Sequence, residues 1–222
     1  MTTLAEENYL KAIYKHALID NKGVSTNTLA EELKTKAASV TDMLRKLSEK
    51  ELINYKKYQG VTLTSRGKKV AINIIRKHRL WEVFLVEKLK FKWDEVHDIA
   101  EQLEHINSKE LIERLDNYLG YPKFDPHGDP IPDKTGNIKE HKENTLDKLN
   151  EGEEGNILGV KEHAAAFLQY LESVKLVLGT KIKVVKHFDY DNSKIIKVNG
   201  TQELTISEMV SKNLYIRSNE EI

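Results

Sequence analysis

All four prolines of the chain lie in one short segment, between Pro122 and Pro132. Proline lacks a backbone donor and clashes with the preceding turn, so no helix can run through this segment. Before it, apolar residues recur at the spacing of helices, and after it several short stretches alternate as strands do. The 222 residues are therefore expected to form a helical part followed by a smaller strand-rich part.

The first 63 residues carry the pattern of three helices and a hairpin. Apolar spacing predicts helices over residues 4–18, 26–33 and 37–50. Ser25 is a suitable N-cap for the second helix. Two strands are predicted next, over 52–57 and 61–63, with Gly60 in the turn. This order is typical of a winged helix-turn-helix, in which one helix enters the major groove of DNA.

The charges are unevenly distributed, although Lys+Arg 35 and Asp+Glu 35 cancel over the whole chain. Residues 1–80 hold 16 basic and 8 acidic residues, whereas residues 81–160 hold 10 and 19. A basic first third suits a polyanion, most simply nucleic acid. An acidic middle suits metal cations or a solvated helical surface.

The third helix and the hairpin offer side chains suited to DNA. Small side chains at the start of the helix allow close approach to bases, and basic ones can pair with phosphates. The residues predicted to contact DNA are Lys36, Ala38, Ser39, Thr41, Arg45, Lys56 and Lys57. A three-helix core with no role in DNA binding is the alternative interpretation.

The middle of the chain predicts three more helices, over 66–89, 94–106 and 108–119. Their apolar positions are more numerous than a monomer of this size needs, which predicts a homodimer.

Two polar stripes stand out on these predicted helices. The second of these helices places His97, Glu101, Glu104 and His105 on one stripe, and the first places His78 and Glu82 on another.

Carboxylates buried together would repel one another, and a divalent cation removes that cost. The sequence contains no Cys, so every donor is a carboxylate oxygen or an imidazole nitrogen. Such sets suit Mn(II) or Fe(II), and other divalent transition metals are expected to substitute in vitro. The alternative is an exposed polar face with histidines placed by chance.

The last third of the chain changes to strand periodicity. A helix is predicted over 161–171 and strands over 181–187, 195–198, 204–206 and 214–216. Such short strands suggest a small SH3-like β-barrel. The predicted fold is mainly α with a small β part: a winged helix-turn-helix domain (1–72), a helical metal-binding and dimerisation domain (73–140), a linker (141–155) and an SH3-like domain (156–222).

Six segments follow one another in a specific order over nearly the whole chain: NYLKAIY at 8–14, SVTDMLRKLSEKELI at 39–53, LTSRGKKVA at 63–71, RKHRLWEVFL at 76–85, VHDIAEQLEH at 96–105 and HGDPIP at 127–132. In this order they resemble the iron- and manganese-dependent transcriptional repressors typified by the diphtheria toxin repressor. The last segment is interpreted as a rigid connector because of its prolines.

The resemblance implies two metal sites. The primary, activating site matches Asn8, Glu101, Glu104 and His105. The ancillary site matches His78, Glu82 and His97, to which Glu162 or His163 could add a ligand. Iron-type members tend to carry Met at the position of Asn8 and manganese-type members Asp. At the position of Glu101, iron-type members usually carry Cys, so the carboxylate favours manganese.

The resemblance further implies a repressor of manganese or iron uptake genes that binds palindromic operator DNA as a homodimer. The N-terminus lacks a signal peptide and no apolar stretch approaches the ~18–20 residues that span a bilayer, so a cytoplasmic location without membrane contact is expected. No enzyme activity and no small organic substrate are expected.

Two other functions are compatible with parts of the pattern. One is a metal-independent winged-helix regulator whose polar stripes are structural. The other is a di-metal carboxylate enzyme, but bundle oxidases need Glu-x-x-His pairs from two helices, and the zincin motifs are absent.

Overall fold

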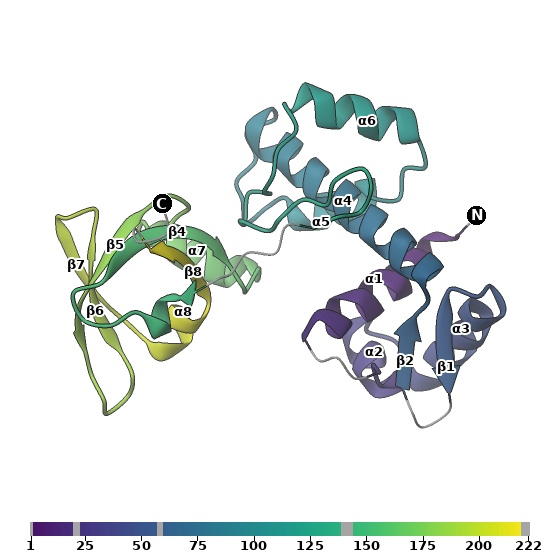
Figure 1. Ribbon diagram of the computed structural model, residues 1–222, viewed down its shortest axis with the longest axis horizontal. Helices are drawn as coiled ribbons and strands as arrows, with labels where there is room; N and C mark the ends of the chain where they lie inside the picture. Colours follow the sequence, from purple (N-terminus) through teal and green to yellow (C-terminus); the bar gives the residue numbers. More distant parts are fainter. Residues whose placement is uncertain (1, 20–22, 57–59, 139–143, 219–222) are drawn as a thin grey trace. The chain divides into compact units, whose positions relative to one another are not determined.

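The computed structural model describes residues 2–19, 23–56, 60–138 and 144–218, and these divide into two compact units. The first unit comprises Met1–Trp81, Ala100–Arg114 and Pro132–Ile138. The second comprises Glu82–Ile99, Leu115–Ile131 and Lys139–Ile222. Each unit is described by itself, and Figure 1 gives the labels of the elements.

The first unit begins with a winged helix-turn-helix, which confirms the sequence prediction. Its helices are α1 (Leu4–Ile19), α2 (Thr26–Glu32) and α3 (Ala37–Glu49), and its hairpin is β1 (Ile53–Lys56) and β2 (Gly60–Leu63). The two strands pair antiparallel, and Val24 exchanges two backbone hydrogen bonds of 2.9 Å with Val61. This bridge fixes the segment before α2 against the wing. Lys57, predicted at the end of the first strand, and the predicted turn residues Tyr58 and Gln59 lie outside the described residues.

Local sequence explains where these helices begin. The Ser25 hydroxyl accepts a hydrogen bond of 3.0 Å from the Thr28 amide and caps α2 as predicted. The predicted apolar faces meet in one core, whose fully buried members include Leu10, Ile13, Leu29, Leu44 and Leu47. These faces hold α1 and α3 in place around the turn.

The remaining helices are α4 (Ser65–Glu87), α5 (His97–Leu103) and α6 (Lys109–Tyr118). The Thr64 hydroxyl caps α4 and the Ser108 hydroxyl caps α6, each by accepting a backbone hydrogen bond. α5 is shorter than the predicted helix over 94–106, because the chain makes turns on either side of it. In the described part of the chain, no helix combines the length and apolar character needed to cross a bilayer.

The C-terminal part of the second unit is an SH3-like domain, as predicted. Its six strands lie in the order β3-β8-β4-β5-β6-β7, with all neighbours antiparallel. The strands are β3 (Asn144–Thr145), β4 (Glu154–Val160), β5 (Lys181–His187), β6 (Lys194–Val198), β7 (Gln202–Ile206) and β8 (Leu214–Ser218). Helices η1 (Leu146–Lys148), α7 (Ala165–Ser173) and α8 (Glu208–Lys212) complete it.

The domain begins earlier than the sequence predicts. The predicted linker over 141–155 contains β3, η1 and the first residues of β4, so residues 144–155 are part of the sheet domain instead. The reason lies in a few apolar side chains inside a polar stretch. Leu146, Leu149 and Ile157 are buried in the domain core, and they fold this segment onto the sheet.

The proline-rich segment packs on the same sheet within the second unit. The His127 carbonyl accepts a hydrogen bond of 3.0 Å from the Val160 amide. Gly128 has a φ of +90°, and a Cβ there would lie 2.2 Å from the Leu158 carbonyl oxygen. Only glycine fits this conformation and this approach, so the segment is held directly against β4.

Candidate metal centres

The first cluster of chemically active side chains lies in the first unit and surrounds Lys11 of α1. The Lys11 ammonium donates to Glu101 Oε1 at 2.5 Å and to Glu104 Oε2 at 2.6 Å, and its Nζ lies 3.3 Å from His78 Nδ1. Lys11 is 4% exposed and Glu104 is fully buried. We call Lys11, His78, Glu101 and Glu104 the Lys11 cluster. It shows that two of the predicted carboxylate ligands converge on one position and already hold a cation there.

Electrostatics explains why the Glu101 carboxylate can stay ionised. Burial alone would raise the pKa of Glu101, but the Lys11 ammonium outweighs that effect and lowers the pKa below its ordinary value. From the sequence, Lys11 is only one residue of a predicted helix, because the periodicity of α1 does not show which residues the Lys11 side chain contacts. Its role appears only when residues 101–104 pack against α1.

Two other predicted ligands border the Lys11 cluster. His105 Nδ1 lies 2.7 Å from Glu7 Oε2, and its Nε2 lies 3.7 Å from Glu104 Oε1. Asn8 is on the same face of α1 as Lys11, three residues before it. Among the described residues, Asn8 Oδ1 and Glu104 Oε1 are buried and accept no hydrogen bond. Orphaned oxygens are costly when buried, so the site has acceptor capacity that a cation could satisfy.

The resemblance matches His78 to the ancillary site with Glu82 and His97. In the first unit, His78 Nδ1 lies 2.6 Å from Glu104 Oε2, within the Lys11 cluster. Glu82 and His97 belong to the second unit, where His97 Nδ1 lies 3.5 Å from Glu82 Oε1.

The second cluster lies in the second unit and consists of Glu82, Asp125 and His127. All three are buried, and each offers one ligand atom within 4.8 Å of the others. The Asp125 carboxylate accepts hydrogen bonds from the backbone amides of His127 and Asp129, at 2.8 and 2.9 Å. These bonds hold the turn that carries His127. We call Glu82, Asp125 and His127 the His127 cluster.

The His127 ring is oriented by its other nitrogen. Its Nε2–H donates to the Trp93 carbonyl at 2.8 Å, which leaves Nδ1 facing Glu82 Oε2 at 3.7 Å. Burial alone would lower the pKa of His127, but Glu82 and Asp125 raise it to about 9. In the metal-free protein the cluster is therefore balanced by a proton on His127. A histidine whose far nitrogen donates to a carbonyl has the arrangement usual in metal ligands.

Glu162 and His163, the two candidate ancillary ligands from the last third of the chain, have different surroundings. The His163 ring stacks on His127 with centroids 4.8 Å apart, and burial lowers its pKa. Glu162 is exposed and accepts a hydrogen bond of 2.9 Å from the Ala164 amide, so it acts at the start of α7. Of the two, His163 borders the His127 cluster.

Sequence reasoning missed Asp125 and His127 as site residues, because it interprets their segment as a rigid connector. The segment is indeed held rigidly, but it also carries two buried ionisable side chains. The available signal was His127 itself, which opens the HGDPIP segment two residues after Asp125. A loop has no periodicity, so the sequence alone could not bring them to Glu82.

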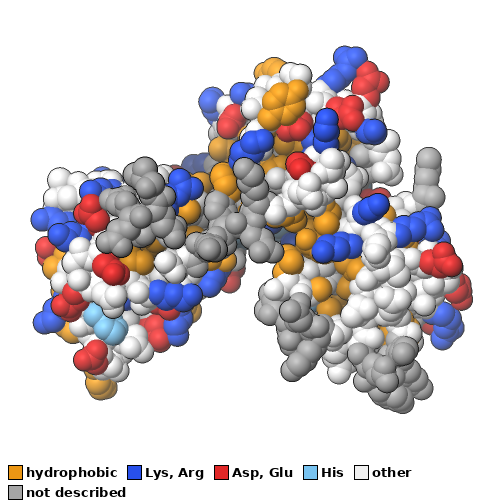
Figure 2. Space-filling view, in the orientation of Figure 1, with side chains coloured by type: hydrophobic (Ala, Val, Ile, Leu, Met, Phe, Trp, Pro, Cys, Tyr) orange, Lys and Arg blue, Asp and Glu red, His pale blue; other side chains and the backbone are white. Residues whose placement is uncertain are grey.

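The helix-turn-helix presents several of its predicted DNA contacts to solvent. Lys36, Ala38, Ser39 and Arg45 are exposed. Thr41 is half-buried, and its hydroxyl donates to the Ala37 carbonyl at 3.0 Å. Lys56 is the last residue of β1, and Lys57 lies outside the described residues. Figure 2 shows basic and acidic side chains interspersed over one face of the SH3-like domain.

Three family models match the chain. The N-terminal DNA-binding domain of iron-dependent repressors matches residues 1–61, and the metal-binding and dimerisation domain of the same proteins matches residues 64–133. The FeoA domain matches residues 144–218. The three matches follow one another in the order of the domains described above.

Individual proteins agree with these matches. The HTH-type transcriptional regulator MntR of Oceanobacillus iheyensis is 36% identical over 126 residues, which are 56% of this chain and 84% of that protein. The iron-dependent repressor IdeR of Mycobacterium leprae is 33% identical over 128 residues, which are 57% of this chain and 54% of that protein. A solved manganese-dependent transcriptional repressor in complex with manganese has a TM-score of 0.86 and 31% identity, over 96% of this chain and 99% of that one.

Proposed function

This chain belongs to the family of iron- and manganese-dependent transcriptional repressors, and from that premise we propose that Mn(II) or Fe(II) activates it to bind operator DNA in the cytoplasm. The genes it represses are those for uptake of the same metal. The operator is palindromic, because the protein acts as a homodimer with two recognition helices. The observation that carries this proposal is the Lys11 cluster, where the buried Glu104 and the partly exposed Glu101 carboxylates converge on the Lys11 ammonium.

The residues that hold the activating metal are Asn8, Glu101, Glu104 and His105. Their donor set of carboxylate, amide and imidazole fits Mn(II) and Fe(II), and the buried oxygens of Asn8 and Glu104 that accept no hydrogen bond supply the vacant acceptor positions. When bound, the divalent cation supplies a second positive charge and directional bonds that one ammonium lacks.

The chain's own part in activation is an exchange of partners. The Lys11 ammonium leaves Glu101 and Glu104, and these carboxylates become ligands together with Asn8 from α1. α1, which packs in the core of the helix-turn-helix, is then tied to residues 101–105 more tightly than by one lysine. A coupling of ~1–3 kcal/mol between metal site and DNA site is enough for a switch of ~5–150-fold.

The His127 cluster supports a second metal site. Glu82, Asp125 and His127 supply its ligands, with His97 and His163 adjoining. The hydrogen bond to the Trp93 carbonyl keeps the His127 proton on Nε2, so that Nδ1 is the nitrogen that loses its proton to become a ligand. A metal at this site would hold the proline-rich segment, which carries Asp125 and His127, in a fixed position beside the SH3-like domain. Both parts belong to the second unit.

Exposed apolar side chains support the homodimer. In the second unit Leu89, Phe91, Tyr118 and Tyr121 are exposed although they are large and apolar. Figure 2 shows hydrophobic side chains on the surface near the C-terminal end of α6. Such residues are typical of protein–protein interfaces, and burial between two copies would remove them from water.

Operator binding measured without oxygen, at buffered free concentrations of Mn(II) and Fe(II), tests this function. We expect no specific binding in metal-free protein and specific binding with either ion, at different free concentrations. Calorimetric titration of the same metal-free protein would report metal binding separately. Metal-independent operator binding would favour the plain winged-helix regulator, and no specific DNA binding under any condition would contradict both.

Arg45 tests the DNA-reading face. Arg45→Ala removes a charge from exposed α3, where the nearest acidic partner, Asp42, lies 4.0 Å away. We expect weaker binding to every duplex and a salt dependence of log K that is shallower by ~0.9, as for one lost phosphate contact. The measurement is fluorescence anisotropy across a salt series. Lys183→Met, on the exposed face of β5, is the control that should leave the slope unchanged.

A further inference from the structure

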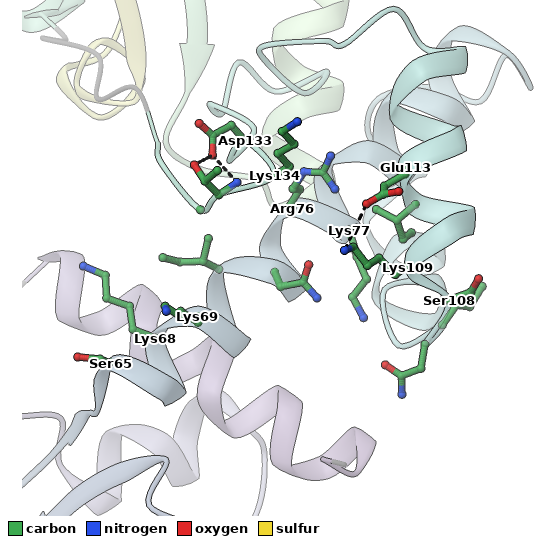
Figure 3. Close-up of a pocket in the computed structure, with 17 residues that line it drawn as sticks. Ser65, Lys68, Lys69, Arg76, Lys77, Ser108, Lys109, Glu113, Asp133 and Lys134 are labelled. Atoms are coloured by element: carbon green, nitrogen blue, oxygen red, sulfur yellow. Dashed lines mark hydrogen bonds and ion pairs between the residues drawn. The ribbon is translucent and has the colours of Figure 1, made fainter.

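A cavity of about 750 Å³ lies within the first unit, between the N-terminal half of α4, the start of α6 and the loop at 133–136. Figure 3 shows side chains from these three places drawn around one open space. Its size is within the ~300–1,000 Å³ of small-molecule sites. The basic residues that line it are Lys68, Lys69, Arg76, Lys77, Lys109 and Lys134, against two acidic ones.

The two acidic residues of the wall are already engaged. Glu113 lies 3.7 Å from Lys109 on the exposed face of α6. The Asp133 carboxylate accepts hydrogen bonds from the amides of Thr135 and Asn137 at 2.7 and 3.0 Å, which shapes the loop at 133–136. Six basic side chains therefore line the wall against two acidic ones, and the cavity as a whole is strongly positive.

Lys77 gives the second, independent observation. It is only 3% exposed, and within the described part of the chain it makes no hydrogen bond or ion pair. Glu7 and Glu104 attract it at longer range, but both carboxylates have closer partners, His105 and Lys11. Its Nζ is not among the fully buried atoms of the described residues that lack a partner, so the ammonium faces the open space of the cavity, where a bound anion can pair with it.

The rest of the wall indicates the kind of anion. Polar side chains of Ser65, Asn73, Asn107 and Ser108 can donate hydrogen bonds, and Ile72, Ile106 and Ile112 form an apolar part. A phosphate group carries ~1.5–2 negative charges at neutral pH, which matches several lysines better than one carboxylate does. Duplex DNA is a convex rod whose phosphates cannot reach a side chain as deeply buried as Lys77.

We propose that this cavity binds a small phosphate compound with several negative charges, with Lys77 at its deepest point and Lys68, Lys69 and Lys109 at its exposed rim. The isoleucine wall accommodates the carbon part of such a compound. The proposal does not depend on the metal site, because every lining residue lies outside the proposed ligand set.

Isothermal titration of the full-length chain with pyrophosphate and with ATP tests the proposal. Metal is removed on a chelating resin and no free chelator is added, because chelators are themselves polyanions and both probes bind metals. We expect one site per chain for at least one probe. In Lys77→Met we expect its Kd to rise about tenfold or more, as for a lost charge-assisted hydrogen bond.

Two further variants and two other ligands serve as controls. Lys183→Met carries the same change on exposed β5 and should leave Kd unchanged. Lys69→Met alters only the rim, so a rise in its Kd supports the site even if Lys77→Met fails to fold. The proposal is overturned if neither probe binds, if citrate binds as tightly as pyrophosphate, or if the lysine changes affect only binding to duplex DNA.

Discussion

Glu104→Gln is expected to abolish the effect of Mn(II) on operator binding while leaving the fold intact. The substitution keeps the shape of a fully buried side chain and removes its charge. Glu101 still pairs with Lys11, so the metal-free cluster survives. The metal then loses a carboxylate ligand, and a stimulation of ~5–150-fold, the usual range for coupled sites, should fall to almost none. Anisotropy titrations at buffered free Mn(II) measure it.

The matched control is Glu110→Gln. Glu110 is an exposed carboxylate on α6 that pairs with Arg114 at 2.6 Å, and its loss changes the net charge equally. Exposed pairs of this kind contribute little, so its metal response should equal that of the unmodified chain. A Glu104→Gln protein that responds to Mn(II) at the same free concentration would show that the activating site lies elsewhere.

Helical periodicity predicted which residues share a face, but it could not predict what that face meets. Glu101, Glu104 and His105 were predicted on one helical stripe, whereas α5 ends at Leu103 and the turn that follows carries Glu104 and His105. Lys11 comes from another helix, 93 residues before Glu104, and their contact depends on packing between segments distant in sequence. The contact between His78 and Glu104 depends on the same kind of packing.

The remaining differences arise where periodicity is weak. Residues 144–155 were predicted as linker because the stretch is polar, charged and glycine-bearing, and the pairing of β4 with β8 comes from residues at the far end of the chain. Asp125 and His127 lie in a turn, where side chains are positioned by hydrogen bonds rather than by a repeat. The fold was therefore more predictable from the sequence than the partners of its buried charges.

Lys11→Met is expected to act in opposite directions on metal-free and metal-bound protein. Without Lys11, the buried carboxylate of Glu104 and the partly exposed carboxylate of Glu101 lose their shared counter-ion, and removal of one member of a buried pair such as Lys11–Glu104 destabilises by ~3–5 kcal/mol. Mn(II) should bind more tightly, since no ammonium has to leave first. We therefore expect a lower melting temperature without metal and a larger rise on adding Mn(II), both measured by calorimetry.

A double-mutant cycle identifies the cause of that effect. If repulsion between the two carboxylates destabilises Lys11→Met, then adding Glu104→Gln should restore part of the lost stability, because only one charge remains. Lys183→Met provides the control for loss of an exposed lysine. A Lys11→Met protein as stable as the unmodified chain without metal would mean that the carboxylates need no internal cation. The exchange of partners between Lys11 and the metal would then lose its physical basis.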